Sequence, residues 1–207
     1  MTTTKKTTAT TSKAKTTAPK TVKAKAVDQP IPDLPANPFI FEILQVVDKQ
    51  RSSAKKVEAL QKFSDPALKV VLIWNFDDSV ISVLPPGEVP YAATSEQSSF
   101  SGTLSAKIED AVSKMNEVGS NSLGSQDQGR SSIRKEYQRF YNFVKGGNDS
   151  LSSLRRETMF INILQGLHPL EAEIVCLIKD KKLQEKYKIT KEIVAEAYPD
   201  IKWGGRS

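Results

Sequence analysis

The side chains best suited to acid–base or nucleophilic chemistry are few and lie apart in the sequence. The chain has one histidine, His168, and one cysteine, Cys176. A catalytic nucleophile needs a base within hydrogen-bonding distance, and neither residue has an identifiable partner of that kind. His168 precedes a proline, a position typical of a helix cap, and Cys176 lies in an apolar run typical of a core. We therefore predict that the chain is not an enzyme and has no catalytic residue.

Metal and cofactor sites are not indicated either. One cysteine and one histidine do not make a conventional zinc site. The adjacent carboxylates Asp77 and Asp78 precede a loop, where a turn is more common than a metal site. Phosphate-binding motifs of the forms GxxxxGK(S/T) and GxGxxG are missing from the sequence. We expect no metal, no cofactor and no small-molecule substrate.

Basic residues are the stronger chemical signal, because their distribution along the chain is uneven. The formal net charge is +6, yet residues 27–129 carry a net charge of −6 and residues 130–207 a net charge of +5. The first 26 residues hold seven lysines and no acid, a composition able to displace counterions from a polyphosphate backbone. The alternative is a tail that serves only solubility. The candidate contacts in the tail are Lys5, Lys6, Lys13, Lys15, Lys20, Lys23 and Lys25.

A second group of basic residues falls in the predicted helices. Arg155 and Arg156 lie near a helix N-terminus, where backbone N–H groups also favour a phosphate. The alternative is a solvated helix face, or ion pairs with Glu157 and Glu171. Some lysines near the last helices have a simpler explanation, because cations stabilise a helix C-terminus. The candidate phosphate contacts in this part are Arg134, Lys135, Arg139, Arg155, Arg156, Lys188 and Lys191.

The elements that position these residues are predicted to be helices. Apolar residues recur at helical spacing in segments that follow a proline or a residue able to cap a helix N-terminus. We therefore expect a mainly α fold, a compact bundle of six to eight short helices with a disordered basic N-terminal tail. Leu154 and Tyr141 fall on the expected buried faces, and residues 80–83 fit either a short strand or a helical turn. The expected helix starts are Asn37–Pro38, Ser53, Asp65–Pro66, Thr103, Ser132, Asp149 or Ser150, His168–Pro169 and Thr190.

Composition divides the chain into four segments. Residues 1–36 form a Lys-, Thr- and Pro-rich disordered tail, and residues 37–118 an acidic helical half. Residues 119–129 form a flexible linker or loop, and residues 130–207 a basic helical half. The longest apolar runs have five residues, whereas a membrane-spanning helix needs ~20. We expect a cytoplasmic protein with no membrane partner.

Several short strings resemble known phage sequences. Residues 41–44, the helix 68–76, the triplet Leu154-Arg155-Arg156 and residues 194–201 resemble the N-terminal DNA-binding domain of phage ATP-dependent DNA ligases. The strings RRETMF, GLHPLEAEI and AYPDIKWGG resemble an uncharacterised protein family of tailed phages of the myovirus type, particularly those of cyanobacteria. The ligase resemblance implies an all-helical module that grips phosphates without reading sequence. A ligase also needs a Lys-x-Asp-Gly motif, which is missing here, because Lys179-Asp180 is followed by Lys181.

Together these observations predict a non-enzymatic phage accessory protein. It would grip duplex or nicked DNA through phosphate contacts, in replication, repair or packaging, and reside in the host cytoplasm or in the virion. Its partners would be DNA and phage replication proteins. Two alternatives remain open: a helical adaptor of phage replication or transcription, and a virion-associated structural protein.

Overall fold

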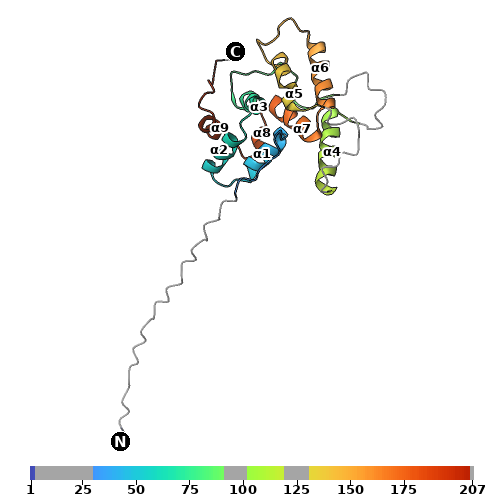
Figure 1. Cartoon of the computed structure of the whole chain (residues 1–207). Coiled ribbons are helices and arrows are strands. Elements are labelled where there is room, and N and C mark those ends of the chain that lie inside the picture. The colour runs from blue at the N-terminus through green and yellow to red at the C-terminus, as the bar shows by residue number, and fades with distance from the viewer. Residues whose placement is uncertain (3–29, 91–101, 119–130, 206–207) are drawn as a thin grey trace.

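The structure is a computed structural model, and it describes residues 1–2, 30–90, 102–118 and 131–205. The seven tail lysines and the linker 119–129 lie outside the described residues. The described part is helical, which confirms the mainly α prediction (Figure 1). It has nine α-helices and one 3-10 helix rather than six to eight helices, because two of them are single turns. The helices are α1 Ile40–Lys49, α2 Ser53–Lys62, α3 Pro66–Phe76, α4 Leu104–Val118, α5 Ile133–Glu136, the 3-10 helix η1 Tyr137–Phe143, α6 Ser153–Gly166, α7 Pro169–Lys179, α8 Leu183–Lys186 and α9 Lys191–Ala197.

Two of the three helix starts predicted from a polar residue followed by proline are confirmed. The Asp65 side chain accepts a hydrogen bond from the Ala67 N–H at 2.8 Å, and Pro66 begins α3. The His168 imidazole accepts from the Leu170 N–H at 3.2 Å, and Pro169 begins α7. Proline has no N–H to lose and its fixed φ suits a first helical turn, so both starts follow from local chemistry.

Two predicted starts are wrong. Helix α1 begins at Ile40 rather than behind Asn37, with Phe39 as its N-cap residue. The Glu42 carboxylate accepts the Phe39 N–H at 2.8 Å, so a side chain inside the helix does what a cap would do. Helix α6 begins at Ser153 instead of behind Asp149 or Ser150. Residues 148–150 form a turn instead, in which the Ser150 hydroxyl donates to the Asn148 side chain at 2.8 Å.

The helix predicted after Ser132 changes type after one turn. Its α-helical part, α5, ends at Glu136, and the tighter η1 continues to Phe143. Because a 3-10 helix turns faster than an α-helix, the buried apolar side chains are Ile133, Phe140 and Phe143, whereas Tyr141 is 53% exposed. The prediction of a buried Tyr141 is therefore wrong.

The segment after η1 is fixed by a close backbone approach and a short β-bridge. A Cβ atom at Gly147 would lie 1.8 Å from the Tyr141 carbonyl oxygen, so only glycine fits there. Val144 pairs with Ser82 in an isolated antiparallel bridge. The Val83 N–H donates to the Phe143 carbonyl at 2.9 Å. Residues 80–83 are thus extended rather than helical.

Helix α7 lies in the middle of the described part and joins its two halves. It packs against α1, α3, α4 and α6, and α9 packs against α2 (Figure 1). The buried apolar residues of both halves belong to one cluster. Residues 30–36 also join this body, since Ile31 and Leu34 pack against the cluster and Asp33 pairs with Lys62 at 2.7 Å. The acidic and basic halves therefore share one core.

A single carboxylate in α7 ties together the beginnings of two distant helices. Glu171 is 0% exposed. It accepts the Ile40 N–H of α1 at 2.9 Å and the Ile133 N–H of α5 at 2.8 Å. The first N–H groups of a helix have no partner within the helix, so Glu171 satisfies donors that would otherwise be buried and unpaired. Burial raises the pKa of this carboxyl above its ordinary value.

Candidate nucleic-acid interface

The residues that could do acid–base chemistry have structural roles. The His168 ring is buried and lies 4.9 Å from the Phe41 ring in a stacked arrangement. Burial lowers the pKa of His168, which keeps Nδ1 available as the acceptor that caps α7. Cys176 lies largely within the core, and burial raises its pKa to about 12. A thiol of that pKa is a poor nucleophile at neutral pH.

Asp77, the candidate metal carboxylate, holds a turn and the C-terminal segment. It is 1% exposed and accepts the Ser79 N–H at 3.0 Å and the Ser79 hydroxyl at 2.8 Å. It also accepts the Gly204 N–H at 3.1 Å. The turn expected at this position is confirmed. Within the residues that the structure describes, no three His, Cys, Asp or Glu side chains are grouped for a metal ion.

Two of the predicted phosphate contacts are used inside the protein. Arg134 donates from Nη1 to Asp65 at 2.6 Å and from Nε to the Pro38 carbonyl at 2.8 Å. Arg156 donates to the carbonyl oxygens of Asn142 and Asn148, both at 2.8 Å. Each guanidinium thus fastens a loop to a helix. The geometry favours a structural role for both arginines.

The other two arginines line one open groove. The groove lies between α6 and the α5–η1 segment and has a volume of about 590 Å³. Arg155 is exposed, and no acidic side chain in the described ranges pairs with it. Arg139 is also exposed and pairs with Glu136 at 3.1 Å. Lys135, one turn before Arg139, is exposed as well. The side chains around the groove include Glu136, Arg139, Leu154, Arg155, Met159 and Asn162.

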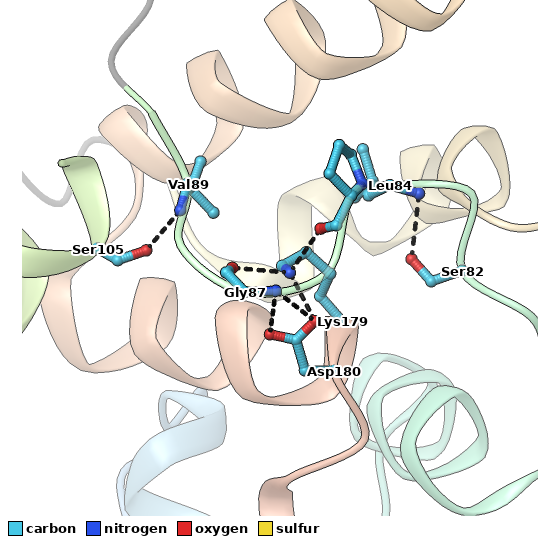
Figure 2. Close-up of polar contacts among 8 residues, drawn as sticks. Ser82, Leu84, Gly87, Val89, Ser105, Lys179 and Asp180 are labelled. Atoms are coloured by element: carbon cyan, nitrogen blue, oxygen red, sulfur yellow. Dashed lines mark hydrogen bonds and ion pairs between the residues drawn. The ribbon is translucent and has the colours of Figure 1, made fainter.

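Most lysines near the last helices have internal partners. Lys179 is 4% exposed and donates to the carbonyl oxygens of Pro85 and Gly87 at 2.9 and 3.0 Å. Its neighbour Asp180 accepts from Lys179 at 2.6 Å and from the Gly87 N–H at 3.2 Å (Figure 2). This pair holds the Pro-rich loop against the end of α7, which accounts for a buried lysine without any ligand.

The two C-terminal lysines predicted to contact phosphate differ in exposure. Lys191 pairs with Asp78 at 3.3 Å, and its Nζ lies 5.5 Å from the Trp203 ring centre. Lys188 is exposed, and its backbone N–H donates to Asp48 at 2.9 Å. Neither residue lines the groove that holds Arg139 and Arg155. Among the residues that the structure describes, the predicted basic residues are therefore not brought into one site.

Sequence reasoning missed two features of the groove. Leu154 is 75% exposed, although its spacing from the buried Ile161 predicted an inward position. Residues 152–155 are all exposed, so no part of the described chain covers this end of α6. Glu136 was also overlooked. Its position one turn before Arg139 was the only signal for it.

Comparison with known proteins gives a family without an assigned activity. The model of a family of unknown function, DUF6433, matches residues 43–123 and 117–185. No curated protein and no solved structure matches the chain. Within the described residues, no helix is both long and apolar enough to cross a bilayer.

Proposed function

Because the chain belongs to DUF6433, a family of unknown function, we propose a function from its own surface chemistry. The protein binds DNA through phosphate contacts, does not read base sequence in a duplex, and has no catalytic activity of its own. Its place is that of an accessory protein in phage replication, repair or packaging. The resemblance of residues 41–44 and 154–156 to phage ligase DNA-binding domains supports this role through Arg155, because Arg156 is used inside the protein.

The observation that carries the proposal is the pair of arginines on one groove. A guanidinium offers a planar fork of donors that matches the two oxygens of a phosphate. Arg155 has this fork free of acidic partners among the described residues, and Arg139 shares its fork only with Glu136. The guanidinium of Arg139 has five N–H donors and its side chain is 63% exposed, so donors remain for a phosphate beside the pair with Glu136.

The seven tail lysines are the second part of the proposed interface. Each lysine that neutralises a phosphate releases a counterion and steepens the dependence of affinity on salt. With all seven engaged, the slope of log K against log salt includes a tail contribution approaching about −6. The tail adds affinity for any sequence, whereas the arginine groove fixes where the strand lies on the folded part.

A salt titration of binding to a fluorescent duplex tests the proposal. We expect Arg139→Ala with Arg155→Ala to weaken binding by about 1 to 3 kcal/mol and to flatten the salt slope by about 2, equally for unrelated sequences. Lys182→Ala is the matched control, because Lys182 is exposed but lines a different groove beside residues 80–87. Replacing the seven tail lysines with glutamine should flatten the slope further. Failure of the wild-type protein to bind any duplex at low salt would refute the proposal.

A further inference from the structure

Three kinds of side chain meet in the groove between α6 and the α5–η1 segment. Arg139 and Arg155 supply positive charge, Leu154 and Met159 supply apolar surface, and Glu136 supplies a carboxylate. Phosphate contacts alone need only the first of these. The volume of about 590 Å³ falls within the roughly 300–1,000 Å³ of sites that enclose small molecules. The groove is therefore large enough for a nucleotide unit, with its base as well as its phosphate.

The carboxylate of Glu136 is incompletely satisfied. Its Oε1 accepts a hydrogen bond from the Ser131 hydroxyl at 2.6 Å. Its Oε2 is buried and accepts no hydrogen bond, although the Arg139 Nη1 atom lies 3.1 Å away as an ion pair. Buried polar atoms in folded proteins almost always have a hydrogen-bond partner. Oε2 is covered in this arrangement, so a donor from outside the chain reaches it when the Arg139 side chain, which is 63% exposed, turns from it to a phosphate.

The apolar part of the groove is also unusual for a surface. Leu154 is 75% exposed, next to the charged Arg155. Burying such a side chain under an apolar surface is favourable, and the flat face of a nucleobase provides one. Bases in a duplex are stacked and paired, so their faces are covered. Only an unpaired base has both its face and its amino group available.

Resting on the proposed function, we infer that this groove takes an unpaired DNA base that carries an exocyclic amino group. The base face covers Leu154 and Met159, the amino group donates to the Glu136 carboxylate, and Arg139 and Arg155 hold the flanking phosphates. Cytosine presents an amino donor where thymine presents a carbonyl acceptor. The groove therefore favours single-stranded cytosine over thymine, two bases of similar size.

Binding of oligo(dC) and oligo(dT) of equal length, measured by fluorescence anisotropy near neutral pH, tests this inference. We expect the wild-type protein to bind oligo(dC) about tenfold more tightly, as one hydrogen bond to a charged acceptor implies. Glu136→Gln places an amide that can donate at the same position, so the preference should vanish or reverse. Glu157→Gln is the matched control, because Glu157 lines a different pocket with Phe160 and Ile161. This variant should keep the preference.

A second variant tests the apolar contact without threatening the fold. Leu154→Gln changes a side chain that is 75% exposed, and we expect it to weaken single-strand binding severalfold while leaving duplex binding unchanged. Ile81→Gln, at a 45% exposed residue of another groove, should change neither. Equal affinity of the wild type for oligo(dC) and oligo(dT), with duplex binding intact, overturns the inference and leaves the proposed function standing. Loss of binding to all DNA overturns both.

Discussion

Glu171 provides the sharpest test of how this fold is held together. The change is Glu171→Ala, which removes the acceptor for the Ile40 and Ile133 N–H groups. Both donors are on residues that are 0% exposed, so bulk water does not reach them in the native fold. Leaving a buried donor unpaired costs about 1–3 kcal/mol, or about 2–6 kcal/mol for two. The change also removes the buried charge of Glu171, which is itself costly to bury, and this offsets part of the cost. We expect a net loss of about 3 kcal/mol in unfolding free energy.

Urea unfolding followed by tryptophan fluorescence measures this loss, because Trp74 is 2% exposed and lies 5.4 Å from the Phe140 ring. The matched control is Glu173→Ala, two residues further along α7. Glu173 pairs with Lys186 near the surface, so its removal should cost less than about 1 kcal/mol. Equal losses for the two variants would refute the role assigned to Glu171.

The raised pKa of the Glu171 carboxyl predicts that the unfolding free energy depends on pH. Burial raises the pKa of Glu171 from its ordinary value of 4.5, so the folded state binds this proton more tightly than the unfolded chain. The stability that the protonated carboxyl contributes is present below pH 4.5 and is lost as the pH rises through the raised pKa. Glu171→Gln cannot titrate. The difference in unfolding free energy between wild type and this variant should therefore fall with rising pH above 4.5, and a flat difference would contradict the assignment.

Two further predictions concern the other buried groups. Burial lowers the pKa of His168 from 6.5, so the stability due to its neutral ring is present above pH 6.5 and is lost as the pH falls through the lowered pKa. His168→Asn keeps an acceptor that can cap α7 but does not titrate. The unfolding free energy of this variant, measured in acid, should therefore lack the pH dependence that His168 contributes. Burial raises the pKa of Cys176 from 9.0 to about 12, which lowers the thiolate fraction at neutral pH. Because a more basic thiolate is also more nucleophilic, we expect the thiol to react with a disulfide reagent about 50-fold more slowly in the native than in the urea-unfolded protein. Equal rates would contradict its burial.

The sequence predicted those helices whose starts are decided locally. Asp65 and His168 cap the helices that begin at the following prolines, and all the atoms involved lie within two residues. The start of α1 was misplaced because its Ile40 N–H is satisfied by Glu171, which is 131 residues away. No local pattern contains that information. The switch from α5 to η1 has the same origin, since core packing rather than spacing decides which aromatic rings turn inward.

The candidate site shows the limit of reading charge from sequence. Arg155 and Arg156 are neighbours in a helix, so their side chains leave it about 100° apart. Arg155 lines the groove, whereas Arg156 binds the carbonyl oxygens of Asn142 and Asn148. The sequence correctly marked this helix end as basic. The sequence does not show which of the two arginines has unpaired N–H donors, because this depends on the loop that packs beside α6.

The position of Glu171 also bears on how the chain folds during its synthesis. Two helices that are synthesised before α7, α1 and α5, depend on this one residue for the partners of their first N–H groups. A nascent chain that ends before it therefore leaves those donors unsatisfied and the centre of the core without α7. Contacts over such long separations form late and fold slowly. We therefore expect α1 and α5 to remain incompletely packed, and accessible to chaperones and proteases, until α7 has left the ribosomal exit tunnel.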